Sequence, residues 1–216
     1  SLGRGVVGPF DGRTIHMEEV HRFANDPVMV RGTMYWDVLR LFHEIKQGMT
    51  KAYLSGPVAS IGIDTWGVDF GMLDQRGNLL ENPVHYRDRR TTGMVEEVFH
   101  HIPREELYGI TGNQIMPINT LFQLFSLKQQ RPEVLERAKT ILFMPDLLNY
   151  FLSGVRSAEY SIASTSQMLD AKQKCWSKRI LEALALPDCI LPELIPTGTR
   201  IGTLDESLCE ELGLEP

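Results

Sequence analysis

Near the start of the chain, short runs of alternating apolar and polar residues surround one strong turn signal. The dipeptide Asp11-Gly12 separates two β-prone runs, so residues 4–10 and 14–22 are predicted to form an antiparallel hairpin. The polar stretch 25–33 contains a proline and a glycine and predicts a connecting loop. The first elements are therefore expected to be a hairpin and a loop.

Helical spacing replaces this alternation after Asp37. Apolar residues at intervals of three and four predict an amphipathic helix that ends between residues 48 and 52. Two apolar runs follow: Ile61-Gly62-Ile63 ends on Asp64, and the second run reaches Asp74. In α/β enzymes buried strands open to ligand at their carboxyl ends, so this stretch predicts a binding site. A hairpin, a helix and two further strands predict an α/β fold with a mixed sheet flanked by helices.

The second half of the chain is mainly helical in pattern, with prolines between its apolar segments. Predicted helices cover residues 92–101, 104–110, 120–128, 132–138, 145–152, 176–184 and 206–212. Strands are predicted at 140–143 and near 200–203, and residues 159–169 are predicted to form a capped loop and a short strand. Asn119 precedes a helix and is expected to cap it, with a contact to a sugar hydroxyl as the alternative.

The composition is that of an ordinary globular protein, and it excludes several classes of function. With 216 residues, 43% of them hydrophobic, the chain is long enough to bury a full core. The net charge is -6 with both signs interspersed, so nucleic acid is not an expected partner. No apolar run approaches the roughly 18 residues of a membrane span. We therefore expect a cytoplasmic protein that does not bind a membrane.

The cysteines and the evenly spaced aspartates form no disulfide or metal pattern. The three cysteines are odd in number and lack the CxxC spacing, which favours a reducing compartment. Asp64, Asp69 and Asp74 lie five residues apart, but strand alternation sends neighbouring positions to opposite faces. No metal site made by the protein alone is expected.

Four separated motifs match a known family in order and in spacing. They are IGIDTWGVDFGMLD, PVHYRDRRT, MPDLLNYFLSG and EYSIASTSQMLD. From about residue 4 to residue 213 the chain resembles the rhamnulokinase branch of the FGGY carbohydrate kinases. The resemblance implies an actin-like ATPase fold, in which two ribonuclease-H-like domains close over ATP and a sugar. Residues 1–216 would form most of the amino-terminal domain and pack on a carboxyl-terminal, nucleotide-binding domain outside this sequence.

The resemblance places a sugar site at the segment Trp66-Gly67-Val68-Asp69. Gly67 would let a ketose lie against the main chain, Trp66 would provide an apolar platform, and Asp69 would accept hydroxyl hydrogen bonds. The alternative is a core tryptophan beside a glycine that forms a β-bulge. Arg87 and Asp88 would lie near the same cleft, and the alternative for them is a surface pair with little effect on stability.

The nucleotide is expected to be ATP, and the Mg²⁺ ion would arrive bound to it. Ser1, Gly3 and Arg4 match the end of the family's Gly-rich phosphate loop, in which main-chain N–H groups approach phosphate oxygens. Leu2 stands where the family has a serine, and the alternative for Arg4 is a surface residue of the hairpin. The family's general base is an aspartate in a His-Asp-Thr motif, which we expect beyond Pro216.

The implied reaction is transfer of a phosphoryl group from MgATP to the O1 hydroxyl of L-rhamnulose. Because the general base would lie elsewhere, residues 1–216 alone are expected to be inactive. Two alternatives stay open: another ketose kinase, such as an L-fuculokinase or a xylulokinase, and a non-catalytic sugar-sensing module. The partners expected for the complete protein are a ketose sugar and ATP.

Overall fold

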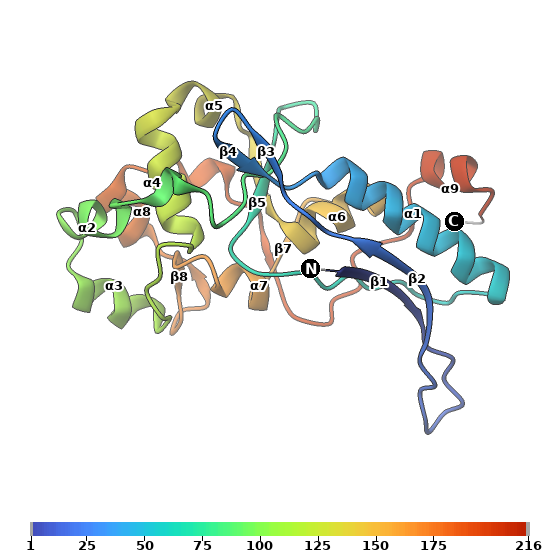
Figure 1. The fold of residues 1–216 in the computed structure, drawn as a ribbon. Coiled ribbons are helices and arrows are strands. Elements are labelled where there is room, and N and C mark those ends of the chain that lie inside the picture. Colours follow the sequence, from blue (N-terminus) through green and yellow to red (C-terminus); the bar gives the residue numbers. More distant parts are fainter. Residues whose placement is uncertain (1, 215–216) are drawn as a thin grey trace.

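A long hairpin projects from the body of the protein in the computed structural model, which describes residues 2–214 (Figure 1). Strand β1 (Leu2–Val7) pairs antiparallel with β2 (Glu18–Ala24). The predicted turn is confirmed at the far end, where Asp11 Oδ1 accepts hydrogen bonds from the N–H groups of Arg13 and Thr14. The strands are shorter than predicted because most of the connection between them lies outside the paired ladder.

A second hairpin lies where a loop was predicted, and that prediction is wrong. Strand β3 (Val28–Val30) pairs antiparallel with β4 (Thr33–Tyr35). Arg31 and Gly32 connect them with φ angles of 49° and 87°, which is the left-handed conformation that a two-residue hairpin turn requires. The polar residues around β3 concealed three consecutive apolar residues with strand propensity.

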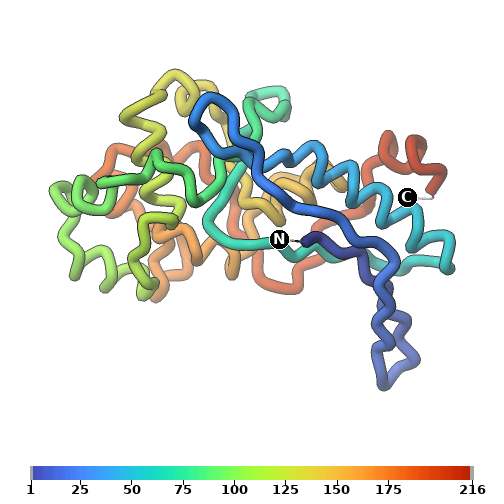
Figure 2. The backbone as a smooth tube through the Cα atoms, in the orientation of Figure 1, coloured from blue at the N-terminus to red at the C-terminus, as the bar shows by residue number. Residues whose placement is uncertain are grey.

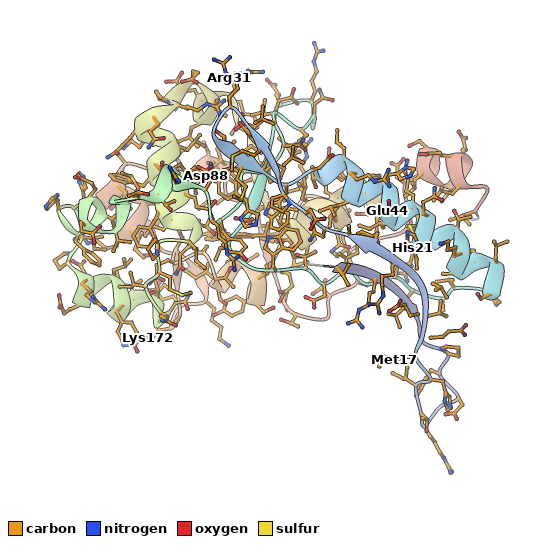
Figure 3. All side chains as sticks on the ribbon, viewed as in Figure 1. Met17, His21, Arg31, Glu44, Asp88 and Lys172 are labelled. Carbon is orange, nitrogen blue, oxygen red and sulfur yellow. The ribbon has the colours of Figure 1, made fainter. Side chains whose placement is uncertain are left out.

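Helix α1 (Val38–Ser55) packs against β1 and β2 and extends past its predicted end. The helix continues through Gly48, which lies against Gly5 of β1. A Cβ added to Gly5 would be 3.6 Å from the Gly48 Cα. Two facing glycines therefore let the helix approach the strand closely. His21 Nε2 and Glu44 Oε2 lie 2.7 Å apart and join β2 to α1 (Figure 3).

Strand β5 (Phe70–Leu73) follows the predicted site and pairs antiparallel with β6 (Thr140–Phe143). All four residues of β5 are buried. The strand predicted at Ile61-Gly62-Ile63 is wrong: within residues 2–214 this segment pairs with no strand, and Ile61 is 39% exposed. An apolar run becomes a strand only where another strand offers its N–H and C=O groups.

The remaining elements are short. The helices and helical turns are η1 (Arg89–Thr91), α2 (Met94–Phe99), α3 (Arg104–Thr111), α4 (Thr120–Gln130), α5 (Pro132–Arg137), α6 (Met144–Ser153), α7 (Tyr160–Ser164), α8 (Lys178–Leu184), η2 (Asp188–Ile190) and α9 (Glu206–Leu212). The strands are β7 (Ala158–Glu159), β8 (Leu169–Asp170), β9 (Cys175–Trp176) and β10 (Leu194–Ile195). The strand predicted near 200–203 is wrong, because the strand that pairs in this region is β10.

Strand pairing is mixed, but the pairs do not join. Among the described residues, β7 and β10 run parallel, and the other pairs β1–β2, β3–β4, β5–β6 and β8–β9 run antiparallel. The α/β class predicted from the sequence is confirmed, whereas the single mixed sheet is replaced in this part of the chain by separate two-stranded pairs. The backbone trace shows helices on both sides of β5 (Figure 2).

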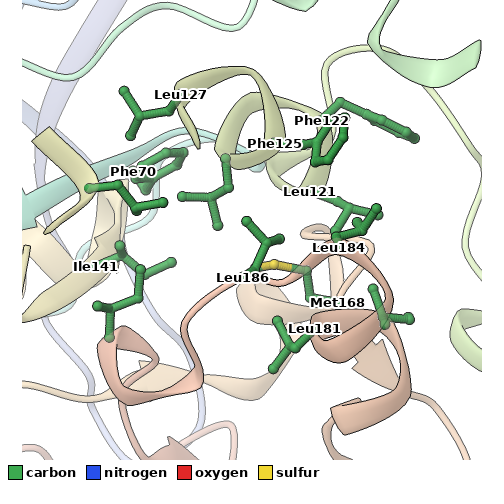
Figure 4. Close-up of a cluster of buried hydrophobic side chains, with 14 of the residues drawn as sticks. Phe70, Leu121, Phe122, Phe125, Leu127, Ile141, Met168, Leu181, Leu184 and Leu186 are labelled. Carbon is green, nitrogen blue, oxygen red and sulfur yellow. The ribbon is translucent and has the colours of Figure 1, made fainter. Parts of the chain in front are cut away.

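The larger apolar core contains residues of α4 together with residues of β5 and β6, among them Phe122, Phe70 and Ile141 (Figure 4). The predicted core residues Phe122, Leu124, Phe125 and Leu127 are all buried, with exposed fractions of 3% or less. Thr120, Gln123 and Ser126 on the same helix are also fully buried. Buried polar side chains need hydrogen-bond partners: Thr120 and Gln123 find theirs at the predicted site, and Ser126 Oγ donates to the carbonyl of Arg90.

No helix formed by residues 2–214 combines the length and the apolar character needed to cross a lipid bilayer.

Candidate functional site

The main chain is strained at Val68, just before β5. The φ angle of Val68 is 70°, and the N–H of Asp69 donates to the carbonyl of Gly67 at 2.9 Å, which closes a γ-turn. A β-branched residue in this conformation costs on the order of 1–3 kcal/mol and persists only where its surroundings fix it. Such strain clusters at functional sites, so the turn is the first feature of a candidate site.

Side chains from two helical segments hold Val68 in this turn. The Val68 N–H donates to Thr165 Oγ1 at 3.0 Å, at the end of α7. The Val68 carbonyl accepts a hydrogen bond of 2.7 Å from Thr120 Oγ1 and one of 3.2 Å from Gln123 Nε2, both on α4. Thr120 and Gln123, two of the three buried polar residues of α4, therefore hold the turn.

Gly67 presents its main chain beside Thr165. A Cβ added at Gly67 would lie 3.0 Å from both Cγ2 and Oγ1 of Thr165, which is closer than about nine in ten real contacts of a Cβ atom. The bulge interpretation of Gly67 does not fit, because the residue precedes β5, whose register with β6 is regular over Phe70–Leu73. The sugar contact of Gly67 stays a prediction, and its half-buried main chain is compatible with it.

Asp69 has a structural role that the sequence did not predict. Its exposed fraction is 0%, and its carboxylate accepts hydrogen bonds from four donors: Trp36 Nε1 at 2.6 Å, Trp66 Nε1 at 3.0 Å, Gln123 Nε2 at 3.1 Å and the N–H of Tyr86 at 3.2 Å. Burial raises the pKa of this carboxyl, and the hydrogen bonds oppose the rise. Oδ2 accepts three of these hydrogen bonds and Oδ1 accepts one, so the carboxylate orients its neighbours, and its contact with a sugar hydroxyl stays a prediction.

Trp36, which the sequence interpretation missed, forms the floor of this region. Its ring centroid lies 4.3 Å from that of Trp66 and 4.1 Å from that of His85, which stacks on it. Trp36 is 4% exposed, whereas Trp66 is only half-buried. Asp69 fixes both indole N–H groups, so Trp66 is the ring that can present an apolar face to a ligand.

Arg87 and Asp88 have different surroundings. Asp88 Oδ2 accepts a hydrogen bond from the N–H of Met34 at 2.8 Å, and Oδ1 accepts one from the N–H of Arg90 at 2.9 Å. Asp88, labelled in Figure 3, therefore joins β4 to η1. The same loop contacts Asp69 through the N–H of Tyr86. Arg87 is exposed, and its guanidinium lies 5.4 Å from the ring centroid of Tyr86. The predicted sugar contacts of these two residues remain predictions.

Arg90 and Gln123 complete the polar network and were not identified from the sequence. Arg90 Nη2 donates to Gln123 Oε1 at 2.6 Å, which turns the Gln123 amide nitrogen toward Asp69. Burial lowers the pKa of the Arg90 guanidinium to about 10, and the Asp69 charge opposes this effect. The network thus links a buried cation, through one amide, to the carboxylate under the turn.

Asn119 occupies the position before α4, but its side chain does not cap the helix. Asn119 Nδ2 donates instead to Gln167 Oε1 at 2.6 Å and to the carbonyl of Gln114 at 3.0 Å. Asn119 is 1% exposed, so the alternative of a sugar contact does not fit either. The capping prediction is wrong because the two bonds from Nδ2 fix the orientation of the amide, and Oδ1, the atom that would accept a cap bond, has no partner among the described residues.

The residues predicted to contact ATP do not form a phosphate loop in the part of the chain that the structure describes. Gly3 lies inside β1 opposite Phe23, where an added Cβ would come within 2.1 Å of the ring. The missing side chain of Gly3 therefore makes room for Phe23. Arg4 is exposed on β1 opposite Arg22, as in the surface interpretation, and Ser1 lies outside the described residues. The contacts of these residues with ATP stay a prediction.

No three His, Cys, Asp or Glu side chains within residues 2–214 are grouped so that they could hold a metal ion.

The candidate site offers a half-buried indole at Trp66, an accessible main-chain segment at Gly67 and a rigid polar support beneath them. Such a surface can bind and orient a small polar ligand with apolar ring faces, because indoles and main-chain groups supply both kinds of contact.

Comparison with protein families and with curated proteins gives a consistent result. Residues 11–216 match the model of the amino-terminal domain of the FGGY family of carbohydrate kinases. The rhamnulokinase of Bacteroides thetaiotaomicron is 42% identical over 213 residues, which cover 98% of this chain and 44% of the relative. The rhamnulokinase of Halalkalibacterium halodurans is 41% identical, covering 100% of this chain and 46% of the relative. The chain spans less than half the length of these relatives.

Solved structures show the same fold at low sequence identity. A ligand-bound xylulose kinase from Lactobacillus acidophilus has a TM-score of 0.87 at 18% identity, covering 99% of this chain and 44% of the other. The glycerol kinase of Plasmodium falciparum with ADP has a TM-score of 0.76 at 16% identity, covering 91% and 42% respectively. The actin-like ATPase fold expected from the motifs is therefore confirmed. The chain belongs to the FGGY family of carbohydrate kinases.

Proposed function

We propose that the complete protein transfers the γ-phosphoryl group of ATP to the O1 hydroxyl of L-rhamnulose. The single observation that carries the proposal within this chain is the strained turn that presents Gly67 beside the half-buried Trp66. Relatives named rhamnulokinase, 42% and 41% identical over nearly the whole chain, favour L-rhamnulose among the ketoses. A sugar lying on Trp66 would meet the main chain of Gly67 at its edge.

In this proposal, residues 1–216 form most of the amino-terminal domain, which supplies the sugar platform. ATP with its Mg²⁺ ion and the general base belong to a second, carboxyl-terminal domain, against which this domain packs. Phosphoryl transfer requires positioning, charge neutralisation and one base rather than covalent chemistry by the protein. The described residues would contribute the positioning: Trp66 and Gly67 hold the sugar, while Asp69 and Asp88 fix the elements beneath it.

The identity of the sugar is tested with the complete protein and a set of ketoses. We expect ATP-dependent phosphorylation of L-rhamnulose with a kcat/KM at least about tenfold above the values for L-fuculose and xylulose. A tenfold difference corresponds to about 1.4 kcal/mol. A higher kcat/KM for another ketose would show that L-rhamnulose is not the preferred substrate, while the proposed kinase activity would stand. Failure to phosphorylate any ketose, together with retained sugar binding by calorimetry, would favour a sugar-sensing module.

The contact at Gly67 is tested by Gly67→Ala in the complete protein. We expect the KM for the ketose to rise about tenfold or more, because the added methyl group would lie 3.0 Å from Thr165 and displace the Gly67 main chain from its position beside the sugar. The KM for ATP should stay within about twofold of the wild-type value, since a local change at the sugar leaves nucleotide contacts intact.

The matched control is Gly109→Ala in α3, where an added Cβ meets nothing within 4 Å. This variant should bind the ketose like the wild type. Equal ketose KM values for Gly67→Ala and Gly109→Ala would remove Gly67 from the sugar site.

A further inference from the structure

The hydroxyl group of Thr165 is used twice, and each use has a defined direction. Its oxygen accepts the Val68 N–H at 3.0 Å, and its proton is donated to the carbonyl of Ile162 at 2.8 Å. A hydroxyl has one proton to give, so the bond to Ile162 leaves a lone pair for Val68. The peptide between Gly67 and Val68 is thereby attached to the end of α7.

The segment that carries Thr165 is itself anchored at its other end. Glu159 caps α7 by accepting hydrogen bonds from the N–H groups of Ser161 and Ile162 at 2.8 and 3.0 Å. The N–H of Glu159 donates in turn to Asp146 Oδ1 at 3.2 Å, on α6. Thr165 therefore directly follows a short helix whose first turn is fixed by Glu159 and is joined, through the N–H of Glu159, to α6.

The methyl group of Thr165 has a second effect at the same place. It faces Gly67, since an added Cβ there would lie 3.0 Å from Thr165 Cγ2. Hydroxyl and methyl group thus act on adjacent residues: the hydroxyl fixes the peptide orientation, and the methyl group forms the wall beside Gly67. From the opposite side, Thr120 Oγ1 holds the Val68 carbonyl at 2.7 Å.

We propose that Thr165 is a positioning residue for the sugar: it holds the Gly67–Val68 peptide in the one orientation in which the Gly67 main chain faces the ketose. The proposal rests on the proposed function, because it needs a ketose at Gly67. Without the Thr165 hydroxyl, the Val68 N–H loses the acceptor that stabilises the positive φ of Val68. The turn then relaxes toward conformations that valine prefers. The main chain of Gly67 then rotates away from the ligand.

The test compares Thr165→Val with Thr165→Ser in the complete protein, using the ketose that the wild type phosphorylates best. Valine keeps the shape and removes the hydroxyl, whereas serine keeps the hydroxyl and removes the methyl group. We expect the KM for the ketose to rise about tenfold in Thr165→Val, the effect of losing one hydrogen bond, and to stay within about twofold in Thr165→Ser. The KM for ATP should be unchanged in both variants.

Melting temperatures separate positioning from a purely structural role. A lower melting temperature in Thr165→Val with an unchanged ketose KM would overturn the proposal, as would an equal rise of KM in Thr165→Ser. If the valine variant does not fold, Thr165→Ala is judged by the same comparison with serine. A wild-type protein that phosphorylates no ketose would instead refute the proposed function, so the two failures are distinguished by the wild-type assay alone.

Discussion

Replacing Asp69 by alanine is expected to lower the free energy of unfolding by about 3–5 kcal/mol. The substitution leaves two indole N–H groups, one amide and one main-chain N–H without their acceptor in a fully buried place. It also removes the negative charge that stabilises the charged form of the Arg90 guanidinium. In a domain of this size the loss corresponds to a fall of about 10 °C in melting temperature, which thermal unfolding of the complete protein measures.

Two comparisons make the Asp69 result specific. Asp188→Ala removes an exposed aspartate and should change stability by no more than about 0.5 kcal/mol. Asp69→Asn keeps one acceptor oxygen and should lie between wild type and Asp69→Ala, because the new amide group meets donors where an acceptor is needed. A melting temperature for Asp69→Ala within about 2 °C of wild type would show that the enclosed carboxylate does not hold the site together.

The local elements of this fold were predictable because their signals lie close together in the sequence. The Asp11-Gly12 turn and the buried face of α4 were predicted correctly for this reason. The segment Ile61-Gly62-Ile63 has the same apolar pattern as β5, yet only β5 pairs with a strand of the described chain. Whether an apolar run becomes a strand depends on a partner about 70 residues away, which periodicity cannot reveal.

The candidate site, too, was only partly predictable from the sequence. The resemblance to a family pointed to Trp66 and Gly67, but it did not reveal that Asp69 is enclosed by donors from four separate segments. Residue type indicates which bonds are possible, and the surroundings decide which are made. One signal was present: α4 carries Thr120, Gln123 and Ser126 at intervals of three on an otherwise apolar helix. A polar stripe inside a core helix indicates buried partners, because such groups are rarely left unpaired.

Asp146 gives the stability of the protein a pH dependence that runs opposite to that of most carboxylates. Its exposed fraction is 4%, and Oδ2 has no hydrogen-bond partner among the described residues. Burial raises the pKa of this carboxyl from 3.8 to about 7, and the nearby charge of Glu159 adds to the rise. Between these two values the folded protein holds a proton that the unfolded chain has released. Stability is therefore greatest below pH 4 as far as this group is concerned, and it is lost as the pH rises toward 7.

We expect this single group to lower the free energy of unfolding by up to about 4 kcal/mol between pH 4 and pH 8. Asp146→Asn has nearly the same shape as the protonated acid and cannot ionise, so its melting temperature should fall less than that of wild type over this interval. Asp188→Asn, which alters an exposed carboxylate, should follow the wild-type curve. Other titrating groups contribute equally to all three proteins, so the difference between the curves isolates Asp146. Parallel curves for wild type and Asp146→Asn would mean that the buried carboxyl ionises as readily in the folded protein as in the unfolded chain. In that case α7, and Thr165 with it, would be anchored by a charged rather than a neutral group.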